Sequence, residues 1–85
     1  MGYQLPVVRE PQTVYEFENG RQFVRASINL FRGKVLCDIR VWFEPEPGEP
    51  LRPSTKGISL LPENLGELEA CIAALRKALA PATRP

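Results

Sequence analysis

The chain has 85 residues, of which 44% are hydrophobic, and its formal net charge is +1. This length favours one domain and is too short for two. A chain of this size buries only about 60% of its unfolded surface, so a partner chain is expected to help hold it together, and the net charge is too small for a bulk attraction to nucleic acids or membranes.

The first half of the chain predicts three strands joined by tight turns. Residues 13–18 (TVYEFE) have the composition of a strand, and Asn19-Gly20 is a strong hairpin signal because both positions tolerate positive φ. In residues 21–31 apolar side chains alternate with polar and aromatic ones, which indicates a half-buried strand. Arg32-Gly33 predicts a second turn, and residues 34–43 (KVLCDIRVWF) repeat the alternation. One face of these strands is therefore apolar, and the other carries basic and aromatic groups.

The second half predicts a loop, a fourth strand and a helix. Residues 44–50 (EPEPGEP) hold three prolines and a glycine, so they form a projecting loop. A strand follows at about 55–60 (TKGISL). From Pro62 onward, apolar residues recur at spacings of three and four, which indicates one amphipathic helix. Its leucine stripe is expected to be core, with a partner groove as the alternative and its exposed margin available to a dimer interface. The folded unit should be residues 13–80, between loose tails at 1–12 and 81–85.

Several classes of chemistry lack the residues that they need. The sequence has no histidine, so Cys37 and Cys71 are expected to be small buried side chains, with a disulfide between them as the minority alternative. We predict no metal site and no cofactor. Paired carboxylates and phosphate-binding glycine loops are also missing, so we predict no catalytic residue and no enzyme. No apolar run approaches the roughly 20 residues of a membrane span, which favours a cytoplasmic protein without a membrane partner.

Two motifs carry a resemblance to a known protein family. FRGKVLCDIRVWFEPEPGE (31–49) followed by RPSTKGISLLPENLGEL (52–68) resembles the transcriptional coactivator family called positive cofactor four. The resemblance covers about residues 14–80, and its densest parts are GKVLCDIR (33–40) and KGISL (56–60). It implies an α+β fold, a curved four-stranded antiparallel sheet followed by one C-terminal helix. It also implies a homodimer whose sheet surfaces form channels for single-stranded DNA.

The resemblance also implies which residues contact DNA. The family's aromatic-basic-Gly-Lys turn falls on Phe31, Arg32, Gly33 and Lys34, its sheet arginine on Arg40, and its lysine before Gly-Ile-Ser-Leu on Lys56. The family's tryptophan falls on Phe43, whereas the tryptophan of this chain is Trp42, so either ring is a candidate for base stacking. Arg25 is a further candidate for DNA contact, which follows from strand alternation and not from the resemblance, because it lies on the same polar face.

Other departures from the family pattern are smaller. Thr55 stands where a basic residue is often found, and Leu61 stands where a polar residue would cap the helix. The long Ser- and Lys-rich tail of animal members is not seen, so a bacterial or phage-type member is expected, nucleoid-associated if bacterial.

The predicted function is binding of single-stranded DNA with little sequence preference, in transcription regulation or genome maintenance. Cations along the backbone path and flat rings for exposed bases are what such binding needs. Three alternatives remain: a protein-interaction module, a binder of single-stranded RNA, and a structural role in which the arginines are solvated and the rings close a core or dimer interface. Asp38, among these cations, is expected to form a salt bridge with Arg40 or Arg25. Contact with the transcription machinery is left open.

Overall fold

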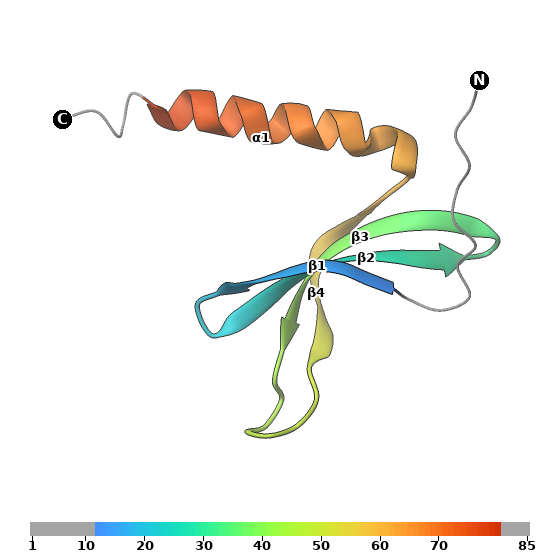
Figure 1. Cartoon of the computed structure of the whole chain (residues 1–85), viewed down its shortest axis with the longest axis vertical. Coiled ribbons are helices and arrows are strands. Elements are labelled where there is room, and N and C mark those ends of the chain that lie inside the picture. The colour runs from blue at the N-terminus through green and yellow to red at the C-terminus, as the bar shows by residue number, and fades with distance from the viewer. Residues whose placement is uncertain (1–11, 81–85) are drawn as a thin grey trace.

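The fold is a single antiparallel sheet followed by a helix, as the sequence predicts. The computed structural model describes residues 12–80. It contains four strands, a 3₁₀ turn and a helix: β1 (Gln12–Asn19), β2 (Gln22–Phe31), β3 (Lys34–Phe43), β4 (Arg52–Leu60), η1 (Pro62–Asn64) and α1 (Leu65–Leu79). Each strand pairs with the next, which gives the sheet order β1-β2-β3-β4 (Figure 1). Of the predicted tails, Gln12 belongs to β1, and residues 1–11 and 81–85 lie outside the described residues.

The first hairpin turns one position later than the sequence suggests. Asn19 pairs with Gln22, so the turn residues are Gly20 and Arg21, and the prediction of an Asn19-Gly20 turn was wrong. Gly20 has a φ of 67° and supplies the positive φ that the first central position of a type II′ turn requires. Asn19 can therefore stay in the strand and complete its pairing.

The other boundaries differ by a few residues from those predicted. β4 begins at Arg52 instead of about residue 55, because Arg52 and Pro53 still pair with Phe43 and Trp42 of β3. Proline is tolerated there because β4 is an edge strand. The helix begins with the 3₁₀ turn at Pro62, and the α-helix proper starts at Leu65. Leu61 offers no side-chain cap, as its apolar side chain predicts.

The strand registers sort the side chains of the sheet into two faces. Direct cross-strand partners lie on the same face. Thus Tyr15, Ala26 and Ile39 share one face, while Ser27, Asp38 and Ser59 share the other. We call the first the apolar face; it carries Tyr15, Phe17, Val24, Ala26, Ile28, Leu30, Val35, Cys37, Ile39, Val41, Ile58 and Leu60.

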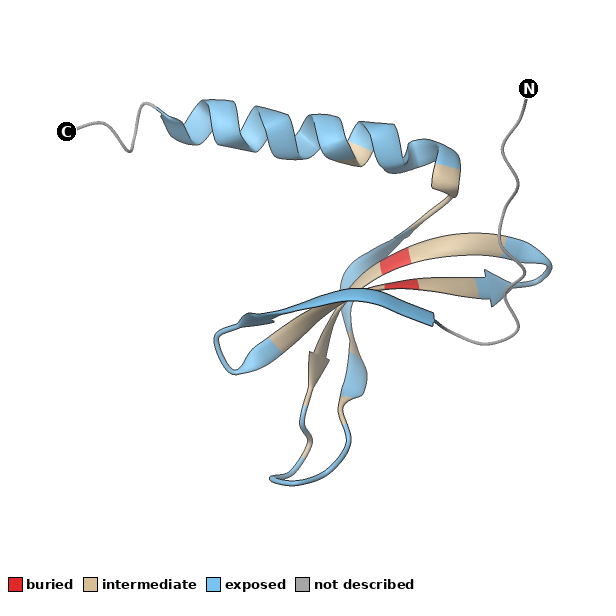
Figure 2. Ribbon diagram, viewed as in Figure 1, coloured by how far each residue is buried: buried red, intermediate tan, exposed pale blue. Residues whose placement is uncertain are grey.

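Within residues 12–80 nothing covers the apolar face. Among the described residues only Ser27 and Asp38 are buried, both polar, and no large side chain is fully buried (Figure 2). The Cα radius of gyration is 15.8 Å, against about 12 Å for a compact chain of this length. The described part of the chain therefore folds its strands without enclosing an apolar core.

The helix projects from the end of β4 away from the sheet (Figure 1). Leu75 and Leu79 on its leucine stripe are exposed, so the prediction that the stripe is core is wrong for the single chain. Cys71 on α1 is exposed as well, against the prediction of burial, and Cys37 is half-buried; both are free thiols. No helix of residues 12–80 is long and apolar enough to cross a membrane.

Candidate nucleic-acid interface

The polar face of the sheet is hollowed. Its hollow has a volume of about 590 Å³. It is lined mainly by β2 and β3, with additions from β1 and β4; the lining residues are Thr13, Arg25, Ser27, Asn29, Leu30, Phe31, Leu36, Asp38, Arg40, Trp42, Pro53 and Ser59. The alternation of β2 and β3 places these basic, polar and aromatic groups together, while most apolar residues of the same strands point to the other side.

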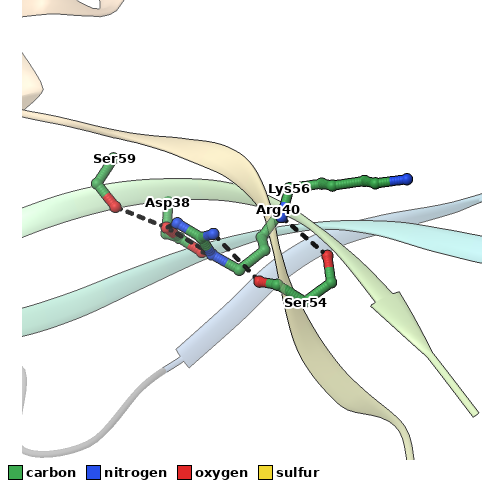
Figure 3. A network of polar contacts seen from close by, with 5 residues as sticks. All are labelled: Asp38, Arg40, Ser54, Lys56 and Ser59. Carbon is green, nitrogen blue, oxygen red and sulfur yellow. Dashed lines mark hydrogen bonds and ion pairs between the residues drawn. The ribbon is translucent and has the colours of Figure 1, made fainter. Parts of the chain in front are cut away.

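A carboxylate fixes the arginine at the centre of this face. Arg40 donates from Nε to Asp38 Oδ2 at 3.1 Å and from Nη2 to Asp38 Oδ1 at 2.9 Å (Figure 3). Its Nη1 donates to the carbonyl oxygen of Ser54 at 3.2 Å, and Ser59 Oγ donates to Asp38 Oδ1 at 2.7 Å. The expected salt bridge of Asp38 is thus made with Arg40 and not with Arg25.

The network holds Arg40 charged and oriented. Hydrogen bonding to Asp38, helped by the charge of that carboxylate, raises the pKa of Arg40 above its ordinary value. A guanidinium has five N–H donors, and the Asp38 and Ser54 bonds use three of them. The other two N–H groups of Arg40 have no hydrogen-bond partner among the described residues.

Arg25 lies against the indole ring of Trp42. Its guanidinium carbon is 4.1 Å from the ring centroid, a cation–π contact, and its Nε donates to Glu16 Oε2 at 2.7 Å. Glu16 on β1 and Trp42 on β3 therefore clamp the guanidinium of Arg25 on β2 from two sides. One ring face of Trp42 is covered by this arrangement.

The second hairpin gathers a ring and two cations at the end of the polar face. Phe31 and Lys34 are direct cross-strand partners and share this face. Arg32 (φ 53°) and Gly33 (φ 78°) both have positive φ, as a type I′ turn requires. The guanidinium carbon of Arg32 is 5.2 Å from the Phe31 ring centroid, and the Phe31 ring stays exposed.

Two predicted contact residues are set apart from this group. Phe43 follows Trp42 along β3 and, by alternation, belongs to the opposite face; Trp42 lines the hollow and Phe43 does not. Lys56 is exposed on β4, and its side chain extends away from the Asp38–Arg40 pair (Figure 3). Lys56 contributes charge at the margin of the sheet.

Several residues that hold the arginines of this site were not predicted from the sequence. Glu16, Ser54 and Ser59 hold the two arginines, directly or through Asp38, but nothing local in the sequence identifies them. The position of Ser27 and Asn29 on the polar face could have been predicted, because both alternate in phase with Arg25 along the strand. Within residues 12–80 no group of three or more cysteine and carboxylate side chains is placed to hold a metal ion.

The arrangement combines fixed guanidinium groups, an exposed ring and a hydrogen-bonding hollow, which together suit a strand of phosphates and unpaired bases. The family model of the Transcriptional Coactivator p15 (PC4) matches residues 18–71, more than half of the chain, and the match includes every candidate contact residue named above. A comparison with the solved structures found no match. The chain therefore belongs to the family of the transcriptional coactivator p15 (PC4).

Proposed function

We propose that this protein is a non-enzymatic coactivator that binds single-stranded DNA on the polar sheet face of a homodimer, with little sequence preference. The observation that carries the proposal is the second hairpin, where the exposed Phe31 ring stands beside Arg32 and Lys34. The ring offers a stacking surface to an unpaired base, and the two cations suit the adjoining phosphates. Duplex DNA keeps its bases stacked and gives Phe31 nothing to bind.

The backbone of Arg32 supports a functional role for this turn. Arg32 has a φ of 53°, a region that non-glycine residues enter at a cost. Asn or Asp at this position would suit a type I′ turn better. An arginine held there against local preference indicates that its charge is used.

The homodimer is supported by the apolar surface that one chain leaves open. Nothing in residues 12–80 covers the apolar face or the helix stripe, and Ile58, Ile72 and Leu75 are exposed among others. A groove lined by Ile58, Leu60, Leu68 and Cys71 runs between β4 and α1. A second copy of the chain would cover these surfaces by a two-fold contact and supply the core that the single chain lacks.

Two other functions remain as outcomes of the test. Single-stranded RNA offers the same phosphates and bases, and nothing on the polar face is assigned to the sugar. A protein-interaction module would use the helix or sheet face for another chain, with nucleic acid incidental. We favour DNA on the family relationship and regard contact with the transcription machinery as part of the proposed role.

A titration with labelled oligo(dT) of about 20 nucleotides tests the proposal, and a duplex of equal length and an RNA strand serve as competitors. The proposal expects affinity for oligo(dT) that falls steeply with added salt, with weaker competition from the duplex and from RNA. Stronger competition by RNA would assign the site to RNA. Absence of binding at low salt would overturn the proposal and leave the protein-interaction module.

A further inference from the structure

Two polar side chains of β2 lie in the hollow without hydrogen-bond partners. Ser27 is only 6% exposed, and its Oγ has no partner among the described residues; the same holds for Asn29 Oδ1. Both residues line the hollow of the polar face. Burying an unpaired polar atom costs about 1–3 kcal/mol, so two such atoms on the same strand face require an explanation.

The neighbouring polar network does not use the hydroxyl of Ser27. Asp38 is the direct cross-strand partner of Ser27 on one side and of Ser59 on the other. The carboxylate accepts hydrogen bonds from Ser59 and Arg40. The hydroxyl of Ser27 is therefore not required to hold the sheet or to orient Arg40, and an alanine would fit the same strand position.

The surroundings of Ser27 and Asn29 favour a base edge over a phosphate. Asn29 Oδ1 is an acceptor and needs a donor, which a phosphodiester lacks. Phe31 lies two residues beyond Asn29 on the same face, about 7 Å along the strand, so a base stacked on Phe31 can direct its edge towards the pair.

We propose that Ser27 and Asn29 hydrogen-bond the edge of an unpaired base that stacks on Phe31. This role deepens the proposed function and rests on it. The hydroxyl of Ser27 donates to a base carbonyl oxygen, and Asn29 Oδ1 accepts from a base N–H, a combination that the adjacent N3–H and carbonyl groups of thymine satisfy. The two side chains then contact a base, and the bound DNA supplies the hydrogen-bond partners that they lack in the free protein.

The test compares oligo(dT) with the same strand made of N3-methylthymidine, which keeps the ring and the phosphates but loses the N3–H donor. Wild type should bind oligo(dT) about fivefold more tightly than the methylated strand, the worth of about one hydrogen bond. Asn29→Ala should lose about the same factor on oligo(dT) and almost nothing on the methylated strand. Ser27→Ala should bind oligo(dT) more weakly while unfolding at the same or a higher urea concentration than wild type.

Gln22→Ala is the matched control, because it removes an exposed amide from the same strand on the opposite face; it should bind both strands like wild type. If wild type binds oligo(dT) and both Ser27→Ala and Asn29→Ala bind it with the same affinity as wild type, this inference is overturned and the proposed function stays intact. Equal losses on both strands in Asn29→Ala, or destabilisation by Ser27→Ala, would also overturn it, because they indicate a backbone contact or a structural role. No wild-type binding to either strand would overturn the proposed function itself.

Discussion

The guanidinium carbon of Arg25 lies 4.1 Å from the centroid of the Trp42 ring, although the two residues are diagonal neighbours on β2 and β3 and not direct partners. Glu16 holds the other side of the guanidinium through a 2.7 Å hydrogen bond. Alternation along β3 places Trp42, and not Phe43, on the polar face, and the contact makes Arg25 part of the surface that Trp42 presents.

The contact predicts a fluorescence signature. Trp42 is the single tryptophan of the chain, so its emission reports on this site alone. Arg25→Ala uncovers the ring to water and should shift the emission maximum to longer wavelength. Glu16→Gln, which loosens the clamp and leaves the cation–π contact, should give a smaller shift. An unchanged spectrum in Arg25→Ala would contradict the stacked geometry.

The Asp38–Arg40 network should be a main source of stability in the sheet. Asp38→Ala removes hydrogen bonds from Arg40 and Ser59 and leaves the half-buried guanidinium without its counter-charge. We expect a loss of about 2–3 kcal/mol in the free energy of unfolding, measured with urea. Glu16→Ala breaks the more exposed ion pair to Arg25 and should cost less than about 1 kcal/mol. Equal losses in the two variants would contradict this ranking.

Gly57 should not tolerate a side chain. It pairs with Arg40, and a Cβ built on it would lie 2.5 Å from the carbonyl oxygen of Ile39 and 2.8 Å from the Cα of Arg40. Because both atoms are backbone, Gly57→Ala must separate β3 from β4, and we expect it to cost about 1–3 kcal/mol in urea unfolding. Gly66→Ala is the control, since nothing lies within 4 Å of the position that its new methyl group would take, and it should be neutral or stabilising.

The exposed stripe of α1 predicts a variant that dissociates the proposed homodimer. Leu75→Glu places a charge on the stripe, and sedimentation equilibrium should then give a mass near the 9.6 kDa of one chain, while wild type gives twice that mass. Lys77→Gln changes the net charge by the same amount on the charged face and should remain dimeric. A wild-type mass of 9.6 kDa at micromolar concentration would contradict the dimer.

The strands, their order and the helix follow from local patterns. The alternation in residues 21–31 and 34–43 predicts β2 and β3, and the apolar spacing after Pro62 predicts the helix. Alternation also places Arg25 and Arg40 on one face. The site partners Glu16, Ser54 and Ser59 depend on cross-strand register, which a single sequence does not specify.

The exposure of the leucine stripe and of Cys71 could not be predicted from the sequence for a different reason. Apolar periodicity predicts that a stripe is buried, but it does not distinguish burial against the same chain from burial against a second copy. Here β4 ends in a direction that carries α1 away from the sheet (Figure 1). The first hairpin turn differs from its predicted position because Gly20 permits a turn on either side of itself.

The most direct test of the central claim is the salt dependence of oligo(dT) binding by the Arg32→Ala/Lys34→Ala double variant. The proposed interface predicts a shallower slope of log affinity against log salt, by about 0.7 for each phosphate of the single strand that the variant no longer neutralises. Phe31→Ala should weaken binding with little change in slope, because stacking releases few counterions. The control is Arg76→Ala/Lys77→Ala, which removes two cations from the last turn of α1 and should keep the wild-type slope. Wild-type affinity and slope in a folded Arg32→Ala/Lys34→Ala dimer would contradict the claim that this hairpin binds the strand.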